Sequence, residues 1–492
     1  MQIRLCVRNI CHHIRTGLIV QIMILLFITG TSGASMPPMP EFEPCQLTPD
    51  GGQSSIQAKC TEIVVPEDPE NPGGRKISLR LVIVPAKHRN KAPDPLFLLA
   101  GGPGQAISEA FPSLAGSFEK IREDRDLVLL DQRGTGGSHP LECSESDDIP
   151  LSDQASIESL RNYLETLDVD LSFYTTEYFL GDLEYVRKLM GYEQINLYGA
   201  SYGTRVAQEY LRLYPQRVRS MILDAVVPPG YRVFYDFRET IPQALEKMLN
   251  RCDEDPHCSA AFPDLRQELL TVLDRLDVEP VPIQLHHPKT GQPLELIMTR
   301  ERFLKCLLPH LYAPETVALL PLSIHAAYEY GDFLPLAGQA TSLDMGIYIG
   351  VMIAATCAED VSFFPPESQW PVVGPLDFSS LPRMLCTICA EVNVKEATAP
   401  VEPDSSAVPV LLLSGDSDPV TPPDQAERAM KTLTNSLHIS VPNMYHGLIT
   451  RGCISDIAAI FIETGSVKAL DTSCAQEIRP APFFINPNGP SP

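Results

Sequence analysis

One pentapeptide, Gly199-Ala200-Ser201-Tyr202-Gly203, constrains the fold of this chain more than any other feature. It lies between an apolar run at Gln194–Tyr198, which predicts a strand, and the segment Thr204–Tyr214, whose pattern predicts a helix. A strand that turns directly into a helix leaves no space for side chains at the flanking glycines and lifts the serine hydroxyl clear of the sheet. The bare pattern G-x-S-x-G is common by chance, so its setting gives it weight. We predict that Ser201 is a nucleophile at this turn.

The rest of the chain repeats this alternation of strands and helices. Short apolar runs bounded by Gly, Pro or Asp predict buried strands, and apolar residues at helical spacing predict a helix at Tyr178–Met190. Further strands are expected at Ile77–Val84, Leu96–Ala100, Leu127–Leu130, Arg219–Val227, Val408–Leu413 and Leu437–Val441, with a helix at Pro423–Leu433. Such alternation predicts an α/β fold with a mostly parallel sheet.

Residues 231–395 differ from the segments on either side. Helical patterns dominate there and strands are scarce; the helices are expected at Ile241–Arg251, Leu265–Leu276, Arg302–Leu311 and Val317–Tyr330. A polar connector at Glu396–Ala407 precedes the return of the strand pattern. Because 492 residues exceed what one core needs, we predict a core in two parts, residues 35–230 and 396–492, with residues 231–395 inserted as a helical cap.

The first 34 residues are predicted to be a signal peptide. Arg4, Arg8 and Arg15 precede the apolar run Leu18–Ile28 without any acidic residue, and small residues follow. Cleavage is expected after Ala34; an uncleaved N-terminal anchor is the alternative. The apolar run is too short to cross a bilayer comfortably, so we expect no stable membrane insertion after cleavage. The chain is predicted to be exported, either to the periplasm or out of the cell.

Cysteine usage agrees with export. Eleven cysteines follow the predicted signal, and in an oxidising compartment three closely spaced pairs are expected to form disulfides: Cys45 with Cys60, Cys252 with Cys258, and Cys453 with Cys474. Cys386 and Cys389 form a C-x-x-C, a pattern also found in zinc and redox sites. No second ligand cluster accompanies them, so structural cysteines are favoured. An odd number leaves at least one thiol unpaired.

The charge balance restricts the class of partner that the chain can bind. The chain has 38 Lys and Arg against 62 Asp and Glu, a formal net charge of −24. Phosphate binding needs a cationic face, so nucleic acid is excluded as a partner, and the acidity itself indicates only a soluble surface. We predict no cofactor and no metal site.

Candidates for a catalytic base and acid follow the serine. A serine hydroxyl needs a base to take its proton, and the base needs an acid to fix its tautomer; after an elbow of this kind the order is serine, acid, histidine. Only His438 and His446 follow the candidate acids, and His438 falls inside a predicted strand, so His446 is predicted to be the base. Asp418, three residues after Gly415 and followed by Pro-Val-Thr-Pro, is favoured as the acid. Asp416 is then expected to cap the loop.

The tetrahedral intermediate of acyl transfer also needs backbone N–H donors. Tyr202, directly after the nucleophile, is expected to supply one. Gly102 is expected to supply the other, from the turn Gly101-Gly102-Pro103-Gly104 after an early strand, since glycines let the backbone approach the oxyanion. A plain tight turn would explain one glycine here but not three around a proline.

Taken together, these motifs resemble a known family. The GGPG turn, the segment DQRGTGGS at 131–138, the serine elbow and the segment GDSDPVTPP at 415–423 resemble the proline iminopeptidases and tripeptidyl aminopeptidases of the α/β-hydrolase fold. The likeness covers most of the chain after the predicted signal, and the GGPG and DQRGxGxS pair is its specific part. The C-terminal section with Cys453 and Cys474 is similar to the TAP-like region of secreted tripeptidyl aminopeptidases, and the cap with Cys252 and Cys258 is similar to theirs.

The resemblance implies an aminopeptidase that releases single residues or short peptides through an acyl-enzyme. Such an enzyme must hold an α-ammonium, which calls for carboxylates near the mouth of the site. The segment Cys357-Ala358-Glu359-Asp360 matches a segment of these relatives, so Glu359 is expected as an ammonium anchor, with Asp360 second. A capped helix end beside a disulfide is the alternative. Arg133 is expected to hold its turn through ion pairs.

Two departures and two rival functions remain. Ala100 stands before GGPG where many iminopeptidases have His. Val392 stands where these relatives often have a Trp after the cysteine that corresponds to Cys389. Because of these two departures, the resemblance does not define the substrate pocket. A carboxylesterase or lipase on the same scaffold would need no ammonium anchor, so the expected partner is a peptide or an ester. A catalytically silent binding protein is the other rival; the complete set of Ser201, Asp418 and His446 argues against it.

Overall fold

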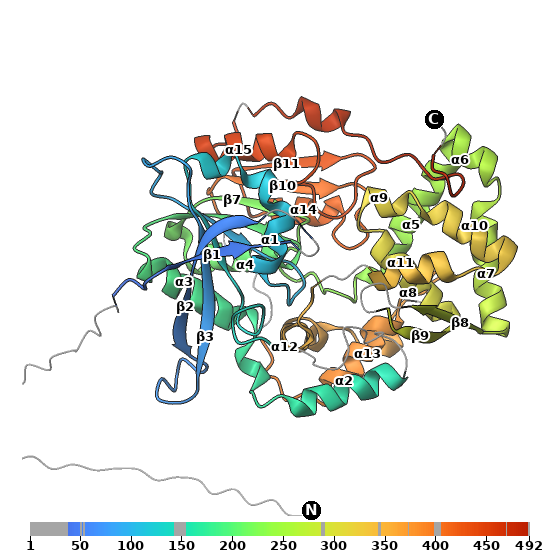
Figure 1. Ribbon diagram of the computed structural model, residues 1–492, viewed down its shortest axis with the longest axis horizontal. Coiled ribbons are helices and arrows are strands. Elements are labelled where there is room, and N and C mark those ends of the chain that lie inside the picture. Colours follow the sequence, from blue (N-terminus) through green and yellow to red (C-terminus); the bar gives the residue numbers. More distant parts are fainter. Residues whose placement is uncertain are drawn as a thin grey trace, which may run out of the picture. The chain divides into compact units, whose positions relative to one another are not determined.

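Nine strands form one sheet, in the order β1-β2-β3-β5-β4-β6-β7-β10-β11 (Figure 1). The structure is a computed structural model that describes residues 38–49, 52, 55–141, 154–286, 291–342, 346–371, 373–397, 405–468 and 470–490. The predicted signal peptide lies outside these residues. In the part of the chain that the structure describes, no helix is both long and apolar enough to cross a membrane.

Six strands run parallel and carry the site. They are β4 (Leu96–Leu99), β5 (Leu127–Leu130), β6 (Ile195–Ala200), β7 (Val218–Asp224), β10 (Val410–Gly415) and β11 (Ser436–Val441). Three antiparallel strands complete one side: β1 (Glu43–Leu47), β2 (Ile56–Pro66) and β3 (Lys76–Val84). The prediction of a mostly parallel sheet is confirmed. The sequence did not reveal β1 and β2, because β2 alternates buried and exposed residues and so lacks the continuous apolar run of a strand buried on both faces.

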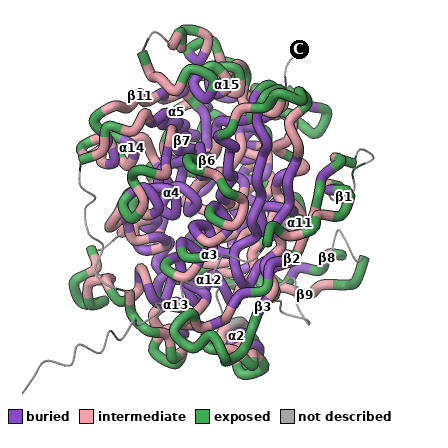
Figure 2. Tube along the Cα trace, turned by 90° about the vertical axis from the view of Figure 1, so that its left-hand side faces the viewer, coloured by how far each residue is buried: buried purple, intermediate pink, exposed green. Residues whose placement is uncertain are grey.

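Two layers of helices cover the parallel strands. The helices are α1 (Ile107–Leu114), α3 (Thr176–Leu189), α4 (Tyr202–Leu213), α14 (Pro423–Met430) and α15 (Ile454–Thr464). Along β4, Phe97 and Leu99 pack into the cluster formed with α3, α4 and α14, whereas Leu96 and Leu98 pack into the cluster formed with α1 and α15. Figure 2 shows the strands buried between the two layers. Because both faces are covered, the strands inside the sheet are largely apolar, which made them predictable; the edge strand β11 is only partly buried.

The inserted segment is mainly helical, as expected. Its helices are α5 (Phe237–Glu254), α6 (Pro256–Ala261), α7 (Leu265–Val278), α8 (Arg300–His310), α9 (Pro314–Val317), α10 (Leu320–Tyr330), α11 (Leu334–Ser342), α12 (Ile349–Glu359) and α13 (Ser380–Cys389). The helix predicted over Val317–Tyr330 corresponds to α10, which begins three residues later, at Leu320; Val317 is the last residue of α9. Pro321 lies at the start of α10, where its missing N–H does not interrupt the helix.

Several elements of the cap were not predicted. A hairpin of β8 (Val281–His286) and β9 (Pro293–Met298) lies within it, and the helices α6, α9, α11, α12 and α13 were not expected. The helix α2 (Gln154–Thr166) precedes the cap in sequence but shares a hydrophobic cluster with α12 and α13 (Figure 1). The domain boundaries at residues 35–230, 231–395 and 396–492 therefore stay a prediction. Short 3₁₀ turns fall at Ala115–Phe118, Ile121–Glu123, Leu171–Phe173, Pro215–Arg217, Val361–Phe363, Glu367–Gln369 and Ser473–Glu477.

Four disulfides join described residues. The three predicted pairs are confirmed: Cys45–Cys60, Cys252–Cys258 and Cys453–Cys474. The fourth, Cys357–Cys389, joins α12 to α13. Cys389 is thus bonded across 32 residues rather than to Cys386, and Cys386 and Cys306 are free thiols. The C-x-x-C is therefore not a redox pair, in line with the structural role predicted for its cysteines.

Candidate active site

Ser201 lies at the sharp turn between β6 and α4. Its backbone angles, φ 53° and ψ −122°, fall in a region that non-glycine residues rarely occupy, and its N–H donates to the carbonyl of Asp224 on β7 at 2.8 Å. A Cβ at Gly199 would lie 2.4 Å from the Gly203 carbonyl oxygen, and one at Gly203 would lie 2.3 Å from the Leu99 carbonyl oxygen. Both glycines are therefore required, as the pentapeptide predicted.

The glycine-rich turn after β4 folds against this serine. A Cβ at Gly101 would lie 3.2 Å from the Cβ of Ser201, so the two backbones touch. Gly102 has φ +110°, which favours glycine, and the Gly101 N–H donates to the Gln105 side-chain oxygen at 3.1 Å. Tyr202, the other expected donor, is buried at the first position of α4. The two segments that should supply N–H donors thus meet at Ser201.

His446 and Asp418 form a close pair after β11 and β10. The histidine Nδ1 lies 2.8 Å from the Asp418 Oδ2. The carboxylate also accepts the backbone N–H groups of Val420 and Thr421, each at 2.9 Å, and the Thr421 hydroxyl at 2.7 Å. Because a carboxylate accepts, Nδ1 carries the proton and Nε2 is the nitrogen that remains able to act as a base.

The charge state of this pair suits a base and its acid. Burial alone would lower the pKa of His446, but the Asp418 carboxylate and its hydrogen bond, with a contribution from Asp224, raise it above the ordinary histidine value. Burial alone would raise the pKa of Asp418, but His446 and the donors of Thr421 hold it below the ordinary aspartate value. Asp418 is therefore ionised at neutral pH and stabilises a protonated His446.

The rejected candidates lie elsewhere. Asp416 accepts the Asn443 N–H at 2.7 Å and the Ser417 hydroxyl at 2.8 Å, which makes it a cap of its own loop. His438 lies within β11, and its Nε2 is 3.0 Å from the Ser414 hydroxyl. Among the described residues, neither of them forms a hydrogen bond or an ion pair with His446.

Two residues near the histidine were missed. Asp224 ends β7 and accepts the N–H groups of Leu448 and Ile449 at 2.8 and 2.9 Å, so it fixes the loop that carries His446. An acid at the end of an apolar strand could have been singled out from the sequence. Tyr312 lies between α8 and α9. Its backbone carbonyl accepts the backbone N–H of His446 at 3.0 Å, and its ring packs edge-on against the imidazole. No local sequence signal distinguishes Tyr312, because its contact depends on how the cap folds.

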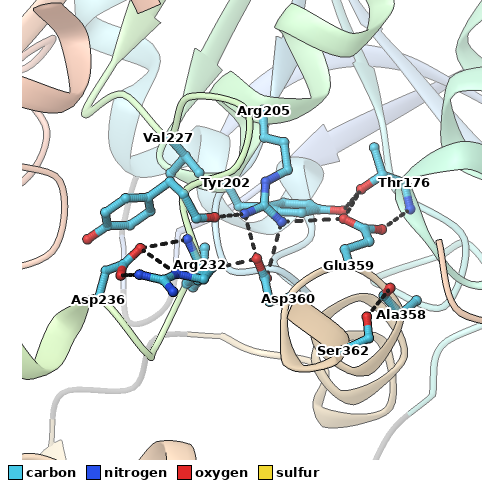
Figure 3. A network of polar contacts seen from close by, with 12 residues as sticks. Thr176, Tyr202, Arg205, Val227, Arg232, Asp236, Ala358, Glu359, Asp360 and Ser362 are labelled. Carbon is cyan, nitrogen blue, oxygen red and sulfur yellow. Dashed lines mark hydrogen bonds and ion pairs between the residues drawn. The ribbon is translucent and has the colours of Figure 1, made fainter. Parts of the chain in front are cut away.

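The predicted ammonium anchors lie at the end of α12 and face the core (Figure 3). Both Asp360 carboxylate oxygens accept from the Arg205 guanidinium, at 2.8 and 3.1 Å, and Asp360 also accepts the Val233 N–H at 3.3 Å. Glu359 accepts the N–H and the hydroxyl of Thr176, each at 2.8 Å, and lies 3.5 Å from Arg205. These contacts join the end of α12, which lies beside the Cys357–Cys389 disulfide, to other segments of the chain; the role of an ammonium anchor stays a prediction.

The electrostatics of this cluster differ from those of the histidine pair. Burial raises the pKa values of Glu359 and Asp360 above their ordinary values, although the charge of Arg205 opposes the shift. Two carboxylates share one guanidinium, so the three side chains carry one negative charge in excess when all are ionised. Asp360 is committed to Arg205 through both oxygens, whereas Glu359 makes the longer ion pair.

Arg133 is placed as its motif predicted. Its guanidinium donates to both oxygens of Asp182, at 2.8 Å each, and to the carbonyls of Glu67 and Phe173. It is fully buried and ties the DQRG turn to α3. The described residues include no group of three or more His, Cys, Asp or Glu side chains able to hold a metal ion.

Comparison with known proteins agrees with this geometry. Residues 94–267 match the α/β hydrolase fold family, and residues 379–474 match the TAP-like protein family. The chain has the α/β-hydrolase fold. In this α/β hydrolase, Ser201 falls in the first matched region, and Asp418 and His446 fall in the second.

Its relatives are named as enzymes. The serine protease Hip1 of Mycobacterium tuberculosis is 30% identical over 214 residues, which cover 39% of this chain and 40% of the relative. The chain therefore spans about two-fifths of the length of that relative. The tripeptidyl aminopeptidase of Streptomyces coelicolor is 24% identical over 472 residues, 86% of this chain and 84% of the relative. The proline iminopeptidase of Neisseria gonorrhoeae is 27% identical over 132 residues, 27% of this chain and 32% of the relative. Each of these three relatives is named as a peptidase.

Proposed function

We propose that this hydrolase is an exported serine aminopeptidase that releases N-terminal residues or short peptides through an acyl-enzyme on Ser201. The observation that carries the proposal is the 2.8 Å contact between His446 and a buried, ionised Asp418, in the chain order that the serine elbow requires. The strained backbone at Ser201 supports the same assignment, because such strain gathers at functional positions.

The mechanism follows from the atoms present. His446 Nε2 takes the proton of the Ser201 hydroxyl as its oxygen attacks the substrate carbonyl, and Asp418 stabilises the imidazolium that forms. The N–H groups of Gly102 and Tyr202 donate to the oxyanion. His446 then gives its proton to the leaving amine. A water molecule, activated by the same nitrogen, attacks the acyl-enzyme and restores Ser201.

Recognition of a free N-terminus is the second part of the proposal. Its support is the names of the relatives, two of which are aminopeptidases that act from the N-terminus, and the excess negative charge at the end of α12. Glu359 is the proposed anchor for the α-ammonium, because its ion pair with Arg205 is the longer one. Asp360, bound through both oxygens, is the second candidate.

Export is supported by the four disulfides, which persist in oxidising compartments. The predicted signal peptide and the TAP-like C-terminal region agree with it.

The test is a panel of fluorogenic substrates on the purified enzyme. Prolyl, alanyl and tripeptidyl amides with free and N-acetylated termini are compared with a short-chain ester, and each assay is repeated with Ser201→Ala. We expect cleavage of at least one free amide, loss of that cleavage on acetylation, and no activity in Ser201→Ala. Glu359→Gln should raise KM for the free amide while leaving ester hydrolysis intact. Ester cleavage without amide cleavage would make the enzyme an esterase, and activity surviving in Ser201→Ala would refute the mechanism.

A further inference from the structure

The two walls of the proposed oxyanion hole come from different segments. Gly102 belongs to the turn after β4, and Tyr202 starts α4 after β6. A pair of donors stabilises an oxyanion only if the spacing between them is fixed before the reaction. Contacts outside the sheet also fix the position of the turn relative to α4.

The start of α12 is joined to the turn. The Tyr348 N–H donates to the Gly104 carbonyl at 2.8 Å, and Ile347 forms a short antiparallel bridge with Gln105. A Cβ at Gly104 would lie 2.7 Å from the Tyr348 carbonyl oxygen, so the approach requires glycine at this position. The Tyr348 hydroxyl also donates to Glu109 on α1, just beyond the turn, at 2.9 Å.

The end of α12 is joined to α4. Asp360 accepts through both oxygens from Arg205, which lies one helical turn after Ser201 (Figure 3). The same guanidinium donates to the Tyr231 carbonyl at 2.7 Å. Both side chains are buried. The Tyr202 hydroxyl shares a hydrogen bond with Thr176, whose hydroxyl donates to Glu359. One helix of the cap thus contacts the turn at one end and the elbow helix at the other.

We propose that α12 is a clamp that sets the oxyanion hole, with Arg205 and Asp360 as positioning residues that hold α4 against the GGPG turn. The proposal rests on the proposed function only for the use of Ser201 and its two N–H donors; it does not depend on a peptide substrate. It makes the seating of the cap a condition for catalysis, because α12 belongs to the cap while the serine belongs to the core.

The test uses an uncharged activated ester, which needs no ammonium anchor, and a fluorophosphonate that traps the serine. In Asp360→Asn, and more mildly in Arg205→Lys, we expect kcat for the ester and the rate of phosphonylation to fall about 10- to 100-fold while KM changes by less than about two-fold. Affinity for a boronic acid that mimics the tetrahedral intermediate should fall in parallel with kcat.

The matched control is Asp182→Asn, which weakens another buried bidentate pair, Arg133–Asp182. It should lower the melting temperature as Asp360→Asn does but leave kcat and boronate affinity unchanged. Equal losses in both variants, or an unchanged kcat in Asp360→Asn, would overturn the clamp. Arg205→Lys keeps the positive charge and so serves if Asp360→Asn does not fold. Wild-type enzyme that cleaves the ester but no amide would refute the aminopeptidase while leaving this test intact, and a wild-type serine that does not react would refute both.

Discussion

Among the buried carboxylates of this molecule, two that lie 2.8 Å from a nitrogen of a basic side chain invite comparison. At one site, Asp418 contacts His446; at the other, Asp360 contacts Arg205. Burial favours a raised pKa at both carboxylates, but the net shifts are opposite: His446 and the Thr421 donors lower the pKa of Asp418, whereas the pKa of Asp360 stays raised although Arg205 opposes the shift. Asp418 also accepts three hydrogen bonds from Val420 and Thr421, while Asp360 has a second carboxylate, Glu359, beside it.

The two sites therefore have similar contact geometry but different roles. Histidine exchanges a proton near neutral pH, so the Asp418 site can move a proton in each catalytic cycle. The guanidinium of arginine stays protonated and offers a rigid fork of donors, so the Asp360 site can hold two helices but cannot take part in proton transfer. The first site lies between two strand ends of the core, and the second joins the cap to the core.

The largest expected effect comes from Asp418→Asn. The amide keeps the volume of the carboxylate but removes the charge that stabilises the imidazolium and the acceptor that fixes its tautomer, so kcat should fall about 10⁴-fold. Steady-state kinetics on the best amide substrate measure this. Asp416→Asn is the matched control in the same loop and should keep kcat within a few-fold of the wild type. If the two variants lose activity equally, the assignment of the acid is wrong.

The next effect is on stability. Arg205→Met leaves Glu359 and Asp360 buried without their cation, so the free energy of unfolding should fall by about 3–5 kcal/mol. Urea unfolding followed by fluorescence measures the change. A loss below about 1 kcal/mol would show that the pair contributes no more than an exposed ion pair.

A smaller effect is expected at Thr421. Thr421→Val keeps the shape of the side chain but removes the hydroxyl that donates to Asp418, so we expect about a ten-fold loss of kcat, equal to the net value of one hydrogen bond to a charged group. The exposed Thr434, whose hydroxyl donates to the Ser406 carbonyl, provides the control Thr434→Val, for which kcat should not change. An unchanged kcat in Thr421→Val would show that this hydroxyl does not contribute to catalysis.

The smallest effect is a shift in pH dependence. His446 must be neutral to accept the serine proton, and its pKa lies above the ordinary histidine value, so kcat/KM should rise with pH through a limb above that value. In Asp418→Asn the carboxylate no longer favours the charged imidazole, so the limb of the residual activity should move to lower pH. Asp360→Asn should leave the limb in place, since Arg205 does not titrate in this range. A limb that moves in Asp360→Asn instead would contradict the separation of the two sites.

The two sites also differ in how far the sequence predicts them. Ser201 and Asp418 each follow a strand that is almost entirely buried, whereas β11, before His446, is only partly buried; chain order brings all three residues to one edge of the sheet. The Arg205 cluster could not be predicted in the same way. Its partners come from α4 and the end of α12, 155 residues apart in sequence, and nothing local to Arg205 indicates that the cap places a carboxylate there.

The same reason explains what was missed in the fold. The strands β4 to β7 were found because each is an apolar run, whereas β2, with alternating burial, was not. The helix α12 is buried on almost every side, so it has no polar face to reveal helical spacing. The unpredicted elements are those whose burial depends on partners distant in sequence.

Acyl transfer on Ser201 through His446 and Asp418 can be tested by reaction with a fluorophosphonate followed by peptide mass mapping. We expect a single covalent adduct on the peptide that contains Ser201, no adduct in Ser201→Ala, and labelling slowed by orders of magnitude in His446→Ala. An adduct on another residue, or labelling at the wild-type rate without His446, would contradict the account.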